Sequence, residues 1–237
     1  MTNKYVDFVS DEVFLEEVKR VMDSYPNDAQ EIPSAIDLLK KSKYGLDEFK
    51  IMFDLCVNDI SFEEWVKAER IRQNGKSIEN KMGEFHQRLL GRVEGWQDLG
   101  TGDNSHVDLK NDDGTIYIEL KNKYNTINSG SGKTVRENLE KIVQENENAT
   151  AYWAYIIHKN YKSDDVIWEK KNYENNERIR RISCDKVYEL VTCDPHALKK
   201  TFRAIPIAIN DILGTEREFS KEDKKIIKEY EDHIFDD

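Results

Sequence analysis

The clearest alternation of apolar and polar residues along the chain lies between positions 107 and 121. Three apolar residues alternate there with three polar or aromatic ones: Ile116, Tyr117, Ile118, Glu119, Leu120 and Lys121. This is the period of a strand with one buried face. Just upstream, Val107 and Leu109 bracket Asp108, and the intervening segment 111–114 ends in Asp-Gly, a strong turn signal. The pattern predicts a hairpin with Glu119 and Lys121 on one face of one strand and Asp108 able to lie across from them.

Helical spacing of apolar residues predominates elsewhere. Short helices are predicted in residues 1–75, one after Ser10, one from Ser34 and one opened by a capping box at Ser61-Phe62-Glu63-Glu64. A stronger helix is predicted over 76–93, where apolar residues recur at helical spacing: Ile78, Met82, Phe85, Leu89 and Val93. Further predicted elements are a helix over 133–147 with charge pairs such as Arg136 and Glu140, a buried strand over 151–157, and helix over 183–210.

The order helix, hairpin, helix, strand predicts an α/β domain with a central mixed β-sheet flanked by helices. We expect one domain overall, with three regions along the chain. These are an N-terminal helical region over 1–75, the core over 76–213 and an acidic helical tail over 214–237.

Asp108, Glu119 and Lys121 together form a set with recognisable chemistry. Hard carboxylate oxygens attract Mg²⁺, which keeps several waters and bridges to phosphate. A lysine beside such a metal can stabilise charge on a phosphate or help to deprotonate water. Exposed strand faces also carry Glu and Lys without function, so the flanking sequence has to decide between a phosphodiesterase site and a solvated hairpin.

The segment that follows Lys121 favours the phosphodiesterase site. It is rich in amides, hydroxyls and lysines, the groups that contact phosphates and bases. The predicted DNA-contacting residues are Lys123, Asn125, Thr126, Asn128 and Lys133. Farther along, Arg178, Arg180 and Arg181 form a basic cluster that either contacts phosphate or lies on a solvated face.

Asp108 followed by Glu119-Leu120-Lys121 fits the PD-(D/E)xK nuclease signature, although no proline precedes Asp108. The longer strings GEFHQRLLGRVEGWQDLG, IYIELKNKYNTINS and VYELVTCDP make the resemblance more specific. Over roughly residues 78 to 213, the chain resembles type II restriction endonucleases that cut GGNCC or GGWCC sites.

The resemblance implies a restriction-endonuclease-like core and Mg²⁺-dependent cleavage of double-stranded DNA at a short palindromic site. Asp108, Glu119 and the Leu120 carbonyl would ligate the metal, and Lys121 would activate water or hold the scissile phosphate. Glu84, on the preceding helix, is a possible further ligand. A palindromic site implies a homodimer, and the resemblance implies a methyltransferase that protects the same sequence.

Two alternatives stay open. Residues 129–134, Ser-Gly-Ser-Gly-Lys-Thr, imitate a phosphate-binding loop around Lys133, which would suit an ATPase. The first glycine of that motif is replaced by Ile127, which counts against this reading. The other alternative is a catalytically dead DNA-binding module that keeps the nuclease core.

Charge and composition alter this picture only slightly. The chain of 237 residues has a formal net charge of −11, which opposes DNA binding. Residues 115–210, however, hold 16 Lys and Arg against 13 Asp and Glu, so the acid is concentrated outside the predicted DNA-facing part. The sequence shows no membrane span or signal peptide, and three cysteines without metal spacing fit a reducing cytoplasm.

Overall fold

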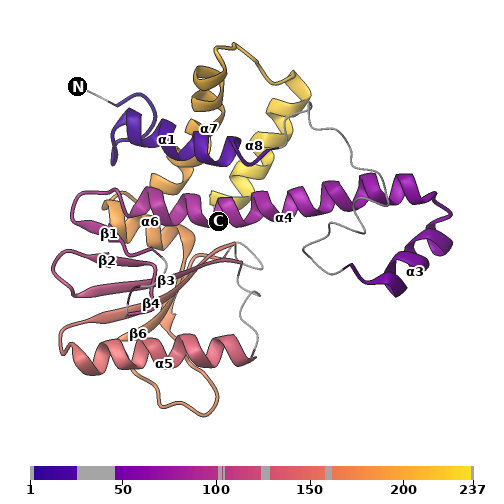
Figure 1. Cartoon of the computed structure of the whole chain (residues 1–237). Coiled ribbons are helices and arrows are strands. Elements are labelled where there is room, and N and C mark those ends of the chain that lie inside the picture. Colours follow the sequence, from indigo (N-terminus) through magenta and orange to yellow (C-terminus); the bar gives the residue numbers. More distant parts are fainter. Residues whose placement is uncertain are drawn as a thin grey trace. The chain divides into compact units, whose positions relative to one another are not determined.

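The computed structural model describes residues 3–25, 46–100, 103, 105–123, 129–157 and 162–235. The chain divides into two compact units, one made of Val21–Lys81 and the other of Met1–Arg20 with Met82–Asp237. Figure 1 labels most of the elements of both units. No helix in the described ranges is both long enough and apolar enough to cross a membrane.

The larger unit contains the sheet and most of the helices. In chain order its strands are β1 (Trp96–Asp98), β2 (Leu109–Asn111), β3 (Ile116–Lys123), β4 (Thr150–Ile157), β5 (Asp165–Ile167) and β6 (Ile179–Ser183). Its helices are α1 (Asp11–Met22, whose last two residues fall in the smaller unit), α5 (Ser129–Glu145), α6 (Cys184–Thr192), α7 (Ala197–Leu213) and α8 (Lys221–Phe235).

The six strands form one mixed sheet in the order β1-β2-β3-β4-β6-β5. The central strands β3, β4 and β6 are parallel, and the outer pairs β1–β2, β2–β3 and β5–β6 are antiparallel. Parallel strands need a crossover, and α5 provides the one between β3 and β4. The predicted central mixed sheet flanked by helices is therefore confirmed.

Helix α5 packs on one face of the sheet, as Figure 1 shows. A core cluster joins its apolar stripe to the sheet, including Val135, Leu139, Ile142, Ala151, Trp153, Tyr155 and Ile179. Arg136 lies beside this core and is fully buried. Its guanidinium donates to the Trp168 carbonyl at 2.5 Å and the Glu174 carbonyl at 2.8 Å, and its Nε is 3.1 Å from Glu140 Oε1.

The predicted pairing of Arg136 with Glu140 is thus confirmed, but the pair does not sit on an ordinary solvated helix face. Besides the two carbonyls, the Arg136 guanidinium lies over the rings of Trp168 and Tyr173, with centroids at 5.9 and 5.6 Å. Burying a cation is tolerated when its donors are satisfied. Arg136 therefore ties α5 to the segment between β5 and β6.

Helix α6 packs against β4 and β6. Its Tyr188 is buried, and the Tyr188 hydroxyl lies 2.8 Å from Nδ1 of the buried His86. Burial lowers the pKa of His86 to about 4, so this histidine stays neutral at ordinary pH. Phe85 next to it packs edge-on against Phe14 of α1, so α1 shares the core of the larger unit.

Helix α4 (Phe62–Leu90) is one continuous helix, whereas the sequence predicted two helices separated near residue 75. Gly75, at the boundary between the two predicted segments, lies within the helix, and a Cβ placed there would meet nothing within 4 Å. A glycine inside a helix costs roughly 1 kcal/mol relative to alanine but does not end it. The predicted capping box is confirmed, because Ser61 N donates to Glu64 Oε2 at 2.8 Å and Glu64 N to Ser61 Oγ at 3.2 Å.

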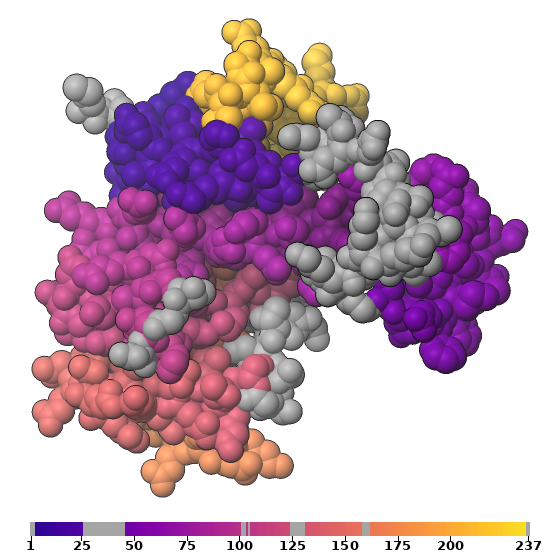
Figure 2. Space-filling view, viewed as in Figure 1, coloured from indigo at the N-terminus to yellow at the C-terminus, as the bar shows by residue number. Residues whose placement is uncertain are grey.

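The smaller unit contains α3 (Glu48–Asn58) and the first part of α4, drawn in purple in Figures 1 and 2. Ile51 of α3 and Trp65 and Val66 of α4 form its core. The helix predicted from Ser34 falls in 26–45, outside the described residues.

Gly91 lies at the end of α4, where the chain approaches β1 closely. A Cβ added at Gly91 would stand 2.5 Å from Asp98 Cβ and 2.6 Å from the Asp98 nitrogen, so the backbone would have to move. We expect Gly91→Ala to lower the free energy of unfolding by about 1–3 kcal/mol, as overpacking does. Denaturant unfolding of the purified protein measures this.

Gly75→Ala is the matched control within the same helical stretch. Because the added methyl group meets open space, this substitution should instead raise the free energy of unfolding by about 0.5–1 kcal/mol. Equal effects of the two substitutions would contradict the close approach at Gly91.

Candidate functional site

The β2–β3 hairpin presents the predicted catalytic residues. Its turn is held by Asn111, whose side-chain oxygen accepts from Thr115 N at 2.9 Å and from Ile116 N at 2.8 Å. Gly114 takes a positive φ of 66°, which glycine adopts without strain. The resulting register pairs Leu109 with Ile118, so the predicted hairpin is confirmed.

Asp108 stands where the pairing of β2 with β3 ends. Its backbone N–H donates to the Ile118 carbonyl at 3.0 Å, and its carbonyl accepts from Leu99 N at 2.9 Å. The carboxylate oxygen Oδ2 accepts from Leu120 N at 2.7 Å. At the end of the β2–β3 ladder, the Leu120 N–H therefore bonds to the Asp108 side chain and not to a main-chain carbonyl. This hydrogen bond holds the Asp108 carboxylate beside the backbone between Glu119 and Lys121.

Glu119 and Lys121 share one face of β3, the same face that carries Tyr117. In the parallel neighbour β4 they pair with Trp153 and Tyr155, which belong to the core under α5. Glu119 is only 7% exposed, and its Oε1 forms an ion pair with Lys121 Nζ. The side chain of Lys121 keeps 34% of its surface accessible, so the ammonium group lies at the boundary between the core and solvent.

The two carboxylates repel each other in a poorly hydrated place. Burial raises the pKa of Glu119 to about 7, and the negative charge of Asp108 adds to the rise, whereas Lys121 opposes it. Burial also raises the pKa of Asp108, against the Leu120 N–H bond and the Lys121 charge. Burial alone would lower the pKa of Lys121, but the two carboxylates outweigh it and the net shift is upward. The site has more buried negative charge than one lysine neutralises, which suits a bound cation.

The donor set fits a hard divalent cation that keeps part of its water. Asp108 and Glu119 provide carboxylate oxygens, and the intervening Leu120 carbonyl belongs to the same stretch of strand. Within the described ranges no group of three or more His, Cys, Asp or Glu side chains is positioned to hold a metal. Mg²⁺ in proteins usually has only one or two carboxylate ligands and keeps several water molecules.

Two further acidic residues lie near this hairpin. Asp98, at the end of β1, is close enough for its charge to raise the pKa of Asp108. Its Oδ1 accepts from Gln87 Nε2 at 2.7 Å and from Gly100 N at 2.9 Å. Glu84 is exposed on α4, next to Gly83, where an added Cβ would stand 3.7 Å from Asn122 Cβ of β3. Sequence reasoning missed Asp98, because only the pairing of the short strand β1 with β2 brings it near Asp108.

The predicted DNA-contacting residues are placed only in part. Lys123 is half-buried at the end of β3, two residues beyond Lys121. Lys133 is exposed on α5 and lies 3.7 Å from Glu137, one turn along the helix. Asn125, Thr126 and Asn128 lie outside the described residues.

The segment that imitates a phosphate-binding loop is helical. Helix α5 begins at Ser129, so Gly130, Gly132 and Lys133 lie within its first turns. A phosphate-binding loop needs non-helical glycine-rich backbone whose N–H groups surround the phosphate before the helix begins. This backbone therefore does not support the ATPase alternative.

The basic cluster of β6 is engaged by the protein itself. Arg178 Nη1 donates to three carbonyl oxygens after α5, those of Asn146, Glu147 and Ala149, at 3.0 to 3.3 Å. Arg180 pairs with Asp165 at 2.6 Å and Arg181 with Asp164 at 2.8 Å. These contacts explain the three arginines as ties between β6 and its neighbours. They do not require a phosphate.

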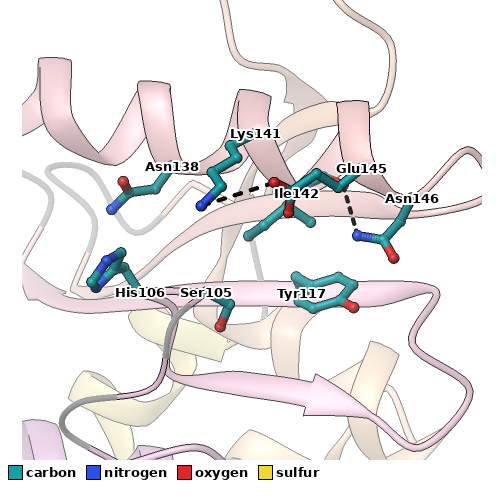
Figure 3. A pocket seen from close by; sticks show the side chains of 8 residues that line it. All are labelled: Ser105, His106, Tyr117, Asn138, Lys141, Ile142, Glu145 and Asn146. Carbon is teal, nitrogen blue, oxygen red and sulfur yellow. Dashed lines mark hydrogen bonds and ion pairs between the residues drawn. The ribbon is translucent and has the colours of Figure 1, made fainter.

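A polar cavity of about 180 Å³ lies near the hairpin, as Figure 3 shows. One wall comes from α5 and the other from residues 105–106 and β3; the lining residues are Ser105, His106, Tyr117, Asn138, Lys141, Ile142, Glu145 and Asn146. Lys141 pairs with Glu145 at 3.9 Å, and Asn146 Nδ2 donates to the Ile142 carbonyl at 3.0 Å. Because Asp108, Glu119 and Lys121 do not line it, we assign the chemistry to the hairpin and not to this cavity.

The comparisons with known proteins cover most of this chain, including the hairpin. Residues 6–214 match the family model described as Eco47II restriction endonuclease. The type II restriction enzyme Sau96I of Staphylococcus aureus is 32% identical over 228 residues, covering 92% of this chain and 84% of that protein. The type II restriction enzyme Eco47II of Escherichia coli is 33% identical over 219 residues, covering 88% of each.

Proposed function

We propose, since the chain belongs to the Eco47II restriction endonuclease family, that it hydrolyses double-stranded DNA at a short palindromic site with Mg²⁺ as cofactor. Membership of that family makes the chain a type II restriction endonuclease, a site-specific nuclease that acts on double-stranded DNA. The proposal adds the metal, the residues that carry the chemistry, and a recognition site of the GGNCC or GGWCC type.

One observation carries the assignment of residues. The Asp108 carboxylate is hydrogen-bonded to the Leu120 amide, between Glu119 and Lys121 in the chain. Asp108, Glu119 and the Leu120 carbonyl would hold Mg²⁺, and Glu84 is a further possible ligand. When bound, the metal supplies Lewis acidity toward a phosphoryl oxygen and lowers the pKa of a coordinated water.

Lys121 would position the attacking water or stabilise negative charge on the phosphate. Its ammonium already faces the Glu119 carboxylate and keeps a third of its side-chain surface accessible, so it can reach an incoming phosphate. There it would stabilise negative charge that develops on the phosphate, or hold the attacking water in line with the phosphorus.

The decisive experiment is digestion of one plasmid of known sequence in the presence of Mg²⁺, followed by mapping of the fragment ends. Discrete fragments whose ends share one five-base palindrome support the proposal, and chelation of the metal should stop cleavage. Binding without cleavage would favour the catalytically dead module. Cleavage at a site unlike GGNCC or GGWCC would refute the proposed specificity while leaving the chemistry intact.

A homodimer that reads both halves of the palindrome is part of the proposal, because a two-fold site is matched by a two-fold protein. So is a methyltransferase of the same specificity, which would protect the host DNA and need not bind this chain. Both proteins would act in the cytoplasm.

Lys123 is the proposed reader of a guanine, with Asn125, Thr126, Asn128 and Lys133 as further DNA contacts. Lysine can donate to O6 and N7 of guanine in the major groove. We expect Lys123→Ala to cost about 1–3 kcal/mol of binding on the cognate duplex and little on a scrambled duplex. Fluorescence anisotropy with Ca²⁺ in place of Mg²⁺, at two salt concentrations, measures both.

Lys225→Ala provides the charge control, because Lys225 is 78% exposed on α8. It removes the same charge from the chain and should leave both affinities nearly unchanged. If Lys123→Ala weakens both duplexes equally and lowers the salt slope by about one, then Lys123 contacts phosphate and does not read a base.

A further inference from the structure

Helix α3 is apolar on two opposite sides. Ile51 and Leu55 face the core that α3 shares with α4. The other side carries the outer face of α3, which we define as Phe49, Met52, Phe53, Cys56 and Val57. Four of these are strongly exposed, at 80%, 58%, 69% and 75% for Phe49, Met52, Phe53 and Val57, and Cys56 is exposed as well. A helix with apolar residues on two opposite sides normally buries both of those sides.

The outer face carries no charge. At about 100° per residue, its five members fall within an arc of roughly 140°. The charged residues Glu48 and Lys50 lie just outside that arc, and Asp54 lies farther round, where it accepts from Trp65 Nε1 of α4. The face is thus a continuous apolar strip and not a set of scattered exposed side chains.

The exposed area is too large to ignore for a single chain. A buried aromatic side chain covers roughly 200 Å², so Phe49 and Phe53 alone leave about 300 Å² in solvent at their exposed fractions. The largest apolar patch on a typical monomer is about 300–600 Å² and is often functional. With Met52 and Val57 added, the strip exceeds half of the roughly 800 Å² that each partner buries in a stable complex.

We infer that the outer face of α3 is the surface through which two copies of this chain associate. An uncharged strip is complementary to itself, which is what a two-fold contact requires. The charges beside the strip are compensated within one chain. Lys50 pairs with Asp54, and Asp54 also accepts from Trp65 Nε1 of α4 at 3.0 Å, so the pair leaves no uncompensated charge that would oppose an antiparallel contact. Antiparallel helices also align their dipoles favourably.

The inference deepens the proposed function, since it supplies the dimer that a palindromic site calls for. It does not depend on the hairpin, because every residue of the outer face belongs to the smaller unit. The association state without DNA can therefore be tested separately from cleavage.

The test is sedimentation equilibrium of the full chain without DNA, comparing the wild type with the double substitution Phe49→Asp and Phe53→Asp. The wild type should dimerise in the micromolar range, and the double substitution should weaken dimerisation by about 100-fold or more, as loss of central interface residues does. Circular dichroism and a thermal melt should match the wild type, because both side chains are exposed in the single chain.

Ile226→Asp is the matched control, since Ile226 is 61% exposed on helix α8. It introduces the same charge at another exposed apolar position and should leave the dimer intact. Labelling of Cys56 with a maleimide gives a second readout: the thiol should be protected in the wild type and reactive in the double substitution, with exposed Cys193 reactive in both.

A monomeric wild type, or a double substitution that still dimerises, would overturn the inference. If the wild type is monomeric and Cys56 is nevertheless protected, another part of the same chain covers the face. A dimer that fails to cut DNA would leave this inference standing and refute the proposed chemistry. A monomer that cuts would overturn this inference and the proposed homodimer, while the proposed metal site and cleavage would stand.

Discussion

Glu119→Gln and Asp108→Ala should each reduce Mg²⁺-dependent cleavage by roughly 10³-fold, because a metal bound by carboxylates stabilises the transition state by several kcal/mol. Each substitution removes one of the two anionic ligands. The fold should survive, since either substitution relieves the repulsion from Asp108 that, together with burial, raises the pKa of Glu119, although Asp108→Ala also removes the acceptor of the Leu120 N–H bond. Glu119→Gln should leave the metal-free protein at least as stable as the wild type.

Three measurements on the same samples separate loss of metal from loss of fold. Cleavage rates report the chemistry, DNA affinity in Ca²⁺ reports the bridging metal, and thermal melting reports the fold. Ca²⁺ should raise the melting temperature of the wild type, as any ligand of the native state does, and should have little effect on Glu119→Gln. Asp113→Ala, an exposed carboxylate at the turn of the same hairpin, is the control and should behave as wild type. Near wild-type cleavage by Glu119→Gln would refute the metal site.

Lys121→Ala should lower cleavage by roughly 10²-fold or more while specific binding in Ca²⁺ falls far less. The first effect is the usual size for a positioned acid–base or electrostatic group, and the second reflects one phosphate contact among several. Single-turnover cleavage with enzyme in excess gives the rate of the chemical step, and anisotropy gives the affinity.

Loss of Lys121 also affects cleavage indirectly, through the protonation of Glu119, and this effect has to be separated from a direct role of the lysine. Lys121 holds down the pKa of Glu119, so its loss would also leave Glu119 more protonated near neutral pH. If that is its main contribution, cleavage by Lys121→Ala should recover as pH is raised above 7, because Glu119 then ionises without help. A deficit that persists at high pH identifies Lys121 as acting on the phosphate or the water.

The hairpin was predictable because every part of it is local. Alternation places Glu119 and Lys121 on one face, and the Asp-Gly turn sets the register that brings Asp108 across from them. The hydrogen bond from the Leu120 amide to the Asp108 carboxylate was not predictable, since it depends on where the ladder stops. The role of the three catalytic residues remains a prediction, and the substitutions above are its test.

The sequence predicted neither the short strands β1, β5 and β6 nor the continuity of the long helix α4, for physical reasons. In β6, Arg180 and Arg181 directly follow Ile179, a pattern that in the sequence is typical of a solvated surface. In the structure, these arginines form ion pairs with Asp165 and Asp164 near β5, and these partners are not evident from the sequence. Strands β1 and β5 have three residues each and show no period. Helix α4 continues through Gly75, since a glycine within a helix costs only roughly 1 kcal/mol and does not by itself end it.

The anchoring of Arg136 bears on how this enzyme could diverge. Arg136 is attached to the segment after β5 chiefly by hydrogen bonds to the main-chain carbonyl oxygens of Trp168 and Glu174. Any amino acid at those two positions provides the same carbonyl oxygen. The exposed side chain at Lys171 can therefore change without loosening the attachment. The arginine itself has no such freedom, because a shorter side chain would leave the buried Trp168 carbonyl without its donor. Mutational drift should accordingly be permissive along that segment and restrictive at position 136.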